Sequence, residues 1–176
     1  MADRPIIYRD PADTGISGGD FYRFGKIGEL NAITIHHSAG PRAVNKDTAR
    51  RLNRSYNAQH INQDWGAIGY HLAMDDHGRL YKLRPFNSKG AHVGGNNTGN
   101  LGIMVHGNYM HHKLTKAQRE TLRWLLTGGI FQLTGVRERE IAVLRGHREW
   151  PGHDSNACPG THIMRHLNWL RDHHFH

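Results

Sequence analysis

The sequence lacks a second cysteine and any long apolar run. Its one cysteine, Cys158, excludes an intramolecular disulfide, so the thiol is either a small buried hydrophobe or a ligand or nucleophile. The longest apolar runs, such as residues 33–35 and 141–144, are far too short to span a membrane. The segment Met1–Pro5 has no long apolar stretch, so we expect synthesis and folding in the cytoplasm without a signal peptide.

Acidic residues are too few to balance the basic ones, and the formal net charge is +8. Such a charge attracts polyanions, which include nucleic acid, acidic lipid surfaces and the anionic bacterial cell wall. The basic residues are spread along the chain without a compact run or a recognisable nucleic-acid module, so a solvated basic surface is an equal alternative. The sixteen histidines favour a metal site, but they also make chance His–His pairs more frequent.

Strand and helix patterns alternate along 176 residues, a length that fits one domain with a single core. We predict strands at 32–36, 67–74, 79–83, 101–106 and 141–144, a turn at 75–78, and helices at 45–59, from a capping box at 115–118 to near Gly128 or Gly135, and from Thr161 through Leu170. Residues 1–30 are interpreted as an irregular lead-in packed on the domain of residues 31–176. The predicted fold is a single α/β domain with a central mixed β-sheet flanked by helices.

Three candidate metal ligands fall at strand ends or in a loop nearby. His36 ends the first predicted strand, His147 follows the last, and Cys158 comes eleven residues later. Two neutral imidazoles and one thiolate are a normal set for Zn²⁺, and three protein ligands leave the fourth position open, which is the catalytic arrangement. The spacing alone is not a recognised zinc motif, and His153 in the same loop is an alternative ligand.

Five short motifs follow one another along most of the chain. They are ITIHHSA at 33–39, WGAIGYH at 65–71, GAHV at 90–93, GHRE at 146–149 and ACPG at 157–160. In this order they resemble the N-acetylmuramoyl-L-alanine amidase family, which includes phage lysis amidases, bacterial wall amidases and animal peptidoglycan recognition proteins. The resemblance extends from residue 30 to residue 172 and implies the fold of that family.

The resemblance implies a role for several matching positions. His36, His147 and Cys158 match the zinc ligands, and Tyr70 matches the tyrosine that assists catalysis in many members. A packed strand residue is the alternative for Tyr70. Glu149 lies two residues beyond His147, and we expect it to orient a ligand or shuttle a proton unless it forms a plain surface ion pair.

Asn156 departs from the family pattern, and the loop between His147 and Cys158 is longer than in several members. Some members place a lysine at the position of Asn156, where it helps to stabilise the developing oxyanion. An asparagine amide donates a hydrogen bond without bringing charge, so more of this work is expected to fall on zinc and Tyr70.

The glycine-rich loop at 90–100 resembles the wall of the family's substrate groove. We therefore place His92, Asn96 and Asn97 among the substrate-binding residues, together with His37. A turn closed by its own asparagine side chains is the alternative for the loop. For His37, the alternative is a packed or supporting residue.

The resemblance implies hydrolysis of the amide between the muramoyl lactyl group and L-alanine of peptidoglycan. Zinc would lower the pKa of a bound water and polarise the carbonyl. The favoured interpretation is a monomeric phage endolysin that acts at the cell wall after release, with peptidoglycan as its partner and without nucleic acid or membrane insertion. Three alternatives remain: a non-catalytic peptidoglycan-binding module, against which Cys158 argues; a cytoplasmic muropeptide-recycling amidase, whose last ligand is commonly aspartate; and a nucleic-acid-binding protein, supported by charge alone.

Overall fold

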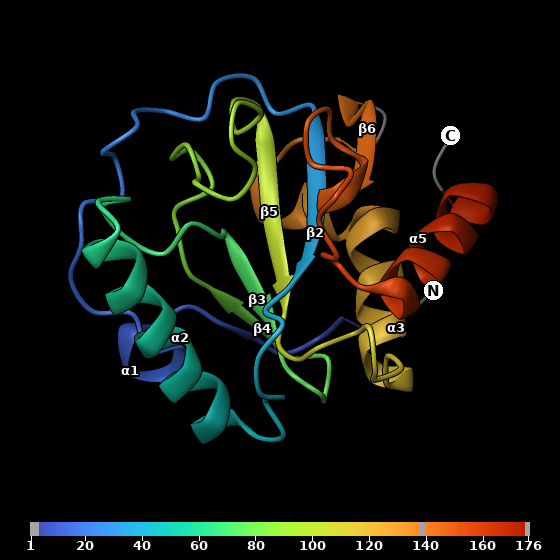
Figure 1. The fold of residues 1–176 in the computed structure, drawn as a ribbon, viewed down its shortest axis with the longest axis horizontal. Coiled ribbons are helices and arrows are strands. Elements are labelled where there is room, and N and C mark those ends of the chain that lie inside the picture. Colours follow the sequence, from blue (N-terminus) through green and yellow to red (C-terminus); the bar gives the residue numbers. More distant parts are fainter. Residues whose placement is uncertain (1–3, 138–139, 175–176) are drawn as a thin grey trace.

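A mixed β-sheet forms the centre of the computed structural model, which describes residues 4–137 and 140–174 (Figure 1). Its strand order within these residues is β1-β4-β3-β5-β2-β6. Neighbouring strands are parallel except β3 and β4, which are antiparallel. The strands are β1 (Ile7–Tyr8), β2 (Ala32–His37), β3 (Leu72–Met74), β4 (Leu80–Lys82), β5 (Asn100–Val105) and β6 (Val143–Gly146). The prediction of an α/β domain with a mixed central sheet is confirmed.

Helices cover both faces of this sheet (Figure 1). On one face lie α1 (Pro11–Thr14) and α2 (Lys46–Asn62); on the other lie α3 (Lys116–Trp124), α4 (Ile130–Thr134) and α5 (Thr161–His174). Each face has its own apolar core, because alternate residues of a strand point to opposite faces. Thus Ile103 packs with Leu122 and Ile163, whereas Met104 packs with Ala49. None of the helices in the described ranges is long and apolar enough to cross a membrane.

Strand β2 positions the future site because it runs parallel between β5 and β6. Its register pairs His36 with Met104 and Ile35 with Gly146. The carboxyl ends of β2 and β6 therefore meet, which brings His147 close to His36. All six residues of β2 are buried, so the backbone that carries His36 is fixed by neighbours on both sides.

The strand predicted at 67–74 is shorter than expected and begins at Leu72. Ile68 and Gly69 do not join a neighbouring strand, because side chains of α2 take their backbone donors. The Ile68 N–H donates to Asn57 Oδ1 at 2.7 Å, and the Gly69 N–H donates to His60 Nδ1 at 3.0 Å. This arrangement leaves Tyr70 in a segment between helix and strand.

The helix predicted from residue 115 begins with the expected capping box, in which Thr115 and Gln118 bond each other's backbone. It does not run straight to Gly135. Helix α3 ends at Trp124, the backbone angles of Thr127 and Gly128 are not helical, and α4 then continues to a left-handed cap at Gly135. The last strand begins at Val143, two residues later than predicted, and α5 begins at Thr161.

The lead-in at residues 1–30 is less irregular than expected. Strand β1 pairs in parallel with β4 at the edge of the sheet, and α1 packs beside α2. Part of the lead-in thus belongs to the fold, while Met1–Asp3 lie outside the described residues. The boundary at residue 30 stays a prediction.

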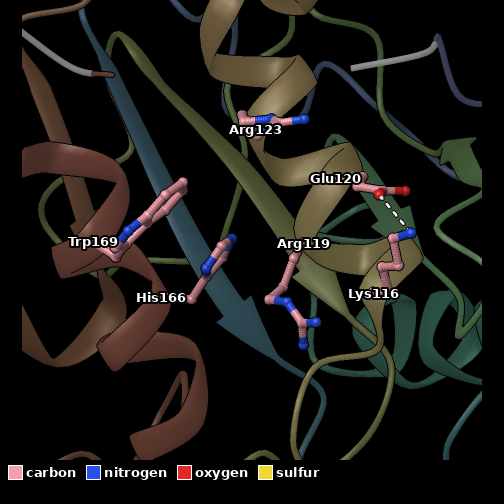
Figure 2. A pocket seen from close by; sticks show the side chains of 6 residues that line it. All are labelled: Lys116, Arg119, Glu120, Arg123, His166 and Trp169. Atoms are coloured by element: carbon pink, nitrogen blue, oxygen red, sulfur yellow. Dashed lines mark ion pairs between the residues drawn. The ribbon is translucent and has the colours of Figure 1, made fainter. Parts of the chain in front are cut away.

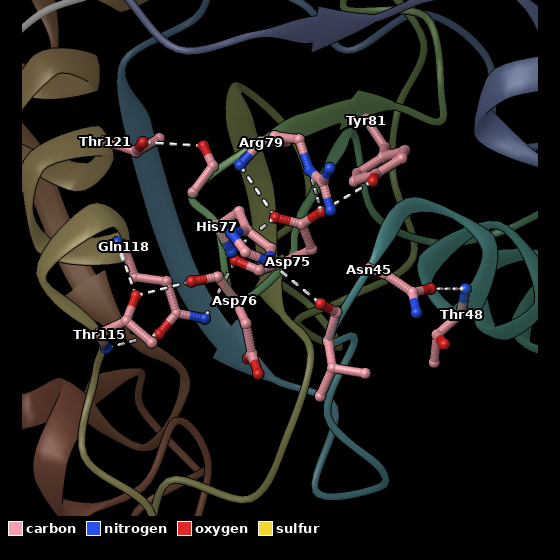
Figure 3. Close-up of polar contacts among 12 residues, drawn as sticks. Asn45, Thr48, Asp75, Asp76, His77, Arg79, Tyr81, Thr115, Gln118 and Thr121 are labelled. Atoms are coloured by element: carbon pink, nitrogen blue, oxygen red, sulfur yellow. Dashed lines mark hydrogen bonds and ion pairs between the residues drawn. The ribbon is translucent and has the colours of Figure 1, made fainter.

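The predicted turn at 75–78 joins β3 to β4 and ties three elements together (Figure 3). The buried Asp75 carboxylate accepts the backbone N–H of His77 and Arg79, the Arg79 guanidinium at 2.6 Å and the Tyr81 hydroxyl at 2.8 Å. The Asp75 carbonyl accepts from the Gln118 side chain at the start of α3. This network holds the sheet against α3.

Candidate metal centre

Three side chains from distant parts of the chain converge where β2 and β6 end. His36 lies on β2, His147 opens a short 3-10 turn after β6, and Cys158 lies in the loop before α5. One donor atom from each lies within 4.8 Å of the others, and Cys158 Sγ is 3.6 Å from His36 Nδ1. The structure therefore brings together the three residues predicted to hold a metal.

The separation between the donor atoms of Cys158 and His36 suits a tetrahedral ion. With Zn–S near 2.3 Å and Zn–N near 2.05 Å, two ligands at the tetrahedral angle lie about 3.6 Å apart. That is the separation between Cys158 Sγ and His36 Nδ1. The set is also soft enough for zinc, with one sulfur and two imidazole nitrogens.

Burial controls the charge state of the three groups. It lowers the pKa of His36 well below its ordinary value, with further lowering by the nearby His92 and His147. It lowers the pKa of His147 to about 4 and raises that of Cys158 to about 12. Both imidazoles are thus neutral and able to offer a lone pair, while the thiol needs a neighbouring cation to ionise.

A cleft of about 730 Å³ opens beside the three groups. His147, Tyr70, His92 and Asn97 line it, and so does Asn156. His153, the alternative ligand, and Trp65, from the motif at 65–71, also line the cleft, together with Phe24 and Lys89, to which no sequence motif pointed. Phe24 and Lys89 share no motif, because one comes from the lead-in and the other from a loop.

Tyr70 is placed to assist chemistry in this cleft. Its ring packs edge-on against His36 with the ring centres 5.0 Å apart. Burial raises the pKa of its hydroxyl above the ordinary value, so the hydroxyl keeps its proton and can donate it in a hydrogen bond. The ring lies before β3, and it is part of the cleft wall instead of a packed strand.

Two of the predicted substrate-binding residues lie outside the cleft lining. His37 is buried, and its Nδ1 accepts the backbone N–H of Tyr109 at 3.1 Å, so the geometry favours the packing alternative. The side chain of Asn96 turns back to the Gly94 carbonyl at 3.4 Å. Asn97 does line the cleft, but its oxygen is taken by the N–H groups of His92 and Val93, as the turn alternative expected.

Asn156 and Glu149 support the turns that carry ligands. The Asn156 Oδ1 accepts the Cys158 N–H at 2.8 Å, which fixes the loop just before the thiol. The Glu149 carboxylate contacts the Arg171 guanidinium on α5 and accepts the Gly146 N–H at 2.7 Å. Glu149 therefore faces α5 and closes the turn that begins at His147, a geometry that favours orientation of a ligand over transfer of a proton.

The fold and this cluster define an α/β protein with a candidate metal centre at the floor of an open cleft. Residues 27–161 match the model of the family described as N-acetylmuramoyl-L-alanine amidase. The chain belongs to the N-acetylmuramoyl-L-alanine amidase family.

Known proteins that resemble the chain include enzymes and recognition proteins. The human N-acetylmuramoyl-L-alanine amidase is 31% identical over 138 residues, which are 77% of this chain but 23% of that protein. The endolysin of Klebsiella phage KP32 is 29% identical over 148 residues, 81% of this chain and 89% of the endolysin. The solved structure of Drosophila PGRP-LB superposes with a TM-score of 0.75 at 22% identity, covering 98% of this chain and 97% of that one.

Proposed function

We propose that the chain is a zinc-dependent amidase that hydrolyses the bond between the muramoyl lactyl group and L-alanine in peptidoglycan. The observation that carries this proposal is the convergence of His36, His147 and Cys158, with donor atoms within 4.8 Å of one another, beside an open cleft. A protein that bound the wall without cutting it would not need a thiol among these donors. Zinc, when bound there, would supply an activated water and polarise the amide carbonyl.

The chain's own residues would bind and orient the amide. The Tyr70 hydroxyl, which stays protonated, donates a hydrogen bond to the carbonyl oxygen as negative charge develops on it. Trp65 and Phe24 offer apolar surface to the sugar and the stem peptide, and Lys89 brings a positive charge to the cleft. This lysine is relevant because Asn156 has no charge to offer at the position where some family members have one.

We further propose that the protein is a phage endolysin that acts as a monomer. It would be made in the host cytoplasm and reach the wall after release. The match over 89% of the KP32 endolysin supports this setting. Its net charge of +8 would favour association with the anionic wall.

Digestion of purified peptidoglycan, followed by mass spectrometry of the new ends, tests the activity. We expect new amino-terminal alanine and free muramoyl lactate, lost on chelation, restored by added zinc and absent in Cys158→Ser. New reducing sugar ends, or cleavage that is insensitive to chelation, would contradict the proposal. Binding to the wall without cleavage would instead identify a recognition module.

A further inference from the structure

Two of the three candidate ligands are each hydrogen bonded to a further histidine. On β2, the Nε2 atom of His36 lies 3.0 Å from Nδ1 of His92. The Nε2 atom of His92 lies 3.1 Å from the backbone carbonyl of Asn100. A carbonyl can only accept, so His92 must carry its proton on Nε2 and leave Nδ1 as an acceptor. His36 then donates from Nε2, and its Nδ1 lone pair is left facing Cys158.

The same chain of contacts recurs at the second ligand. The Nε2 atom of His147 lies 3.2 Å from Nδ1 of His153, whose Nε2 lies 3.1 Å from the Gly94 carbonyl. The same reasoning puts the proton of His147 on Nε2 and leaves its Nδ1 bare. The opposite arrangement would direct an unprotonated Nε2 of His153 at a carbonyl oxygen, which is repulsive.

We propose that His92 and His153 are positioning residues that fix the proton and the ring orientation of His36 and His147, so that the Nδ1 lone pair of each is left for the metal. This inference rests on the proposed function, because zinc is the ion concerned. Partners of this kind commonly orient a metal-binding imidazole, and a carboxylate or a carbonyl usually does so. Here a neutral imidazole stands between the ligand and the carbonyl and adds no charge to the site.

The two chains of hydrogen bonds, one through His92 and one through His153, differ in rigidity. The His92 ring is buried and fills a slot next to two glycines, where a Cβ on Gly102 would lie 2.6 Å from the ring and one on Gly90 2.7 Å. His153 is half-buried in the loop between His147 and Cys158, and it reaches across to the loop at 90–99. Its Nδ1 is occupied by His147, so the geometry does not favour His153 as a ligand.

Substitutions at His153 separate these roles, because the half-buried site tolerates change. His153→Leu removes the acceptor, whereas His153→Asn keeps an acceptor at the Nδ1 position. Measured by competition with a chromophoric chelator, zinc affinity should fall about tenfold to a hundredfold in His153→Leu and be largely recovered in His153→Asn. His77→Leu is the matched control, since the His77 ring also bonds a backbone carbonyl, that of Val44, away from the cluster. We expect unchanged zinc affinity there.

Imidazole ¹⁵N spectra of the metal-free protein provide the second measurement. We expect His36 and His147 to be protonated on Nε2 in the wild type, with His147 becoming a mixture in His153→Leu. Protonation on Nδ1 in the wild type, or equal zinc affinity in all three variants, would overturn the proposal. Because the spectra need neither zinc nor substrate, they test the roles of His92 and His153 even if the chain hydrolyses no peptidoglycan.

A second, independent observation concerns the surface between α3 and α5 (Figure 2). A hollow of about 250 Å³ lies there, and none of its lining residues belongs to the cleft. It is lined by Lys116, Arg119, Glu120, Arg123, His166 and Trp169. An adjoining hollow shares three of these residues and adds Lys113 and Arg165. We call the two hollows together the α3–α5 groove.

The α3–α5 groove combines positive charge with a flat aromatic ring. Arg119 and Arg123 lie one turn apart on α3, and Glu120, the one acid among the described residues that line the hollow, pairs with Lys116 at 3.8 Å (Figure 2). Trp169 is 41% exposed, and the rings of His166 and His173 both stack on it, with the ring planes 9° and 21° apart. Guanidinium groups bind carboxylate and phosphate in a fork, and the exposed part of the indole offers apolar surface to a sugar ring.

We also propose that this groove binds an acidic polysaccharide, independently of the cleft. The sugar rings would contact the exposed part of Trp169, and their carboxylate, sulfate or phosphate groups would bind Arg119 and Arg123. Charge complementarity supports an anionic occupant, and the exposed ring favours a glycan over a simple polyanion.

A heparin-derived tetrasaccharide is a suitable probe for titration against the full chain. Affinity should fall roughly tenfold in Arg119→Gln/Arg123→Gln, which corresponds to the loss of one or two ionic contacts. Arg51→Gln/Arg54→Gln removes the same charge from exposed positions on α2 and should change the affinity less than about twofold. Trp169→Ala should weaken binding of the tetrasaccharide but leave binding of inorganic polyphosphate unchanged. An equal loss in both arginine pairs, or no effect of Trp169→Ala, would overturn the proposal.

Discussion

His71, which precedes β3, and His36, near the end of β2, are both fully buried histidines with lowered pKa values. They differ in how their ring nitrogens are used. His71 uses both, since Nε2 contacts the Ser88 carbonyl at 2.8 Å and Nδ1 accepts the Gly102 N–H at 3.0 Å. His36 uses only Nε2 in this way, and its Nδ1 faces a sulfur atom. Burial and a lowered pKa therefore do not mark a site in this chain; a buried lone pair that faces a second potential ligand, as that of His36 faces Cys158, does.

The largest effect is expected when the thiol that faces the His36 lone pair is removed. Cys158→Ser replaces the thiol by a poorer zinc ligand, so amidase activity should fall roughly a thousandfold or more, together with bound zinc. Metal content and release of amino-terminal alanine measure the two losses. The free energy of unfolding in chelator should change by less than about 1 kcal/mol. Unchanged zinc content in this variant would show that Cys158 is not a zinc ligand.

His71→Leu should do the reverse and lower stability without touching the metal. It leaves the Ser88 carbonyl and the Gly102 N–H buried without a partner, which costs about 2–4 kcal/mol for the two groups. Urea unfolding in the presence of chelator measures this loss. If zinc affinity fell instead while stability was unchanged, His71 would support the metal site and would not be a purely structural histidine.

Tyr70→Phe tests the surroundings of His36, because the Tyr70 ring packs against His36. Removing the hydroxyl should lower kcat about a hundredfold, in line with the loss of one oxyanion donor. Zinc content and KM should stay close to wild type, because the ring and its packing are kept. A drop in zinc content equal to the drop in activity would show that Tyr70 supports the metal site and not the reaction.

A pH series gives the smallest effect. The pKa of His71 is lowered to about 4 by burial, so its contribution to stability is present above the unfolded value near 6.5 and lost as pH falls below it. Between pH 6.5 and 5.5 this single group should cost the metal-free protein about 1 kcal/mol. The stability of His71→Leu should therefore fall less steeply over that interval. Parallel curves for the two proteins would contradict the assignment.

The sequence was sufficient for the parts of the fold and site that depend on local pattern. The alternation in β2, the capping box at Thr115 and the strand-end positions of His36 and His147 are all visible in the residues themselves. With the order of the motifs, these features were enough to predict that Cys158 would meet the two histidines.

Features that depend on distant partners could not be predicted in this way. A two-residue strand such as β1 has no pattern and exists because β4 is beside it. The late start of β3 at Leu72 depends on side chains of α2. Glu149 turns away from the cleft because it pairs with Arg171, which lies 22 residues further along the chain. The contact between His153 and His147 depends on the path of a loop, which the spacing of the residues does not determine.

The long separation between ligands also has a consequence for synthesis. His36 and Cys158 are 122 positions apart, and β2 gains its second parallel neighbour only when β6 is made. Contacts so distant in sequence form late, after the intervening chain has been ordered. A growing chain therefore cannot offer all three donors until residue 158 has left the ribosome. Capture of a metal that needs all three would mark the completion of folding.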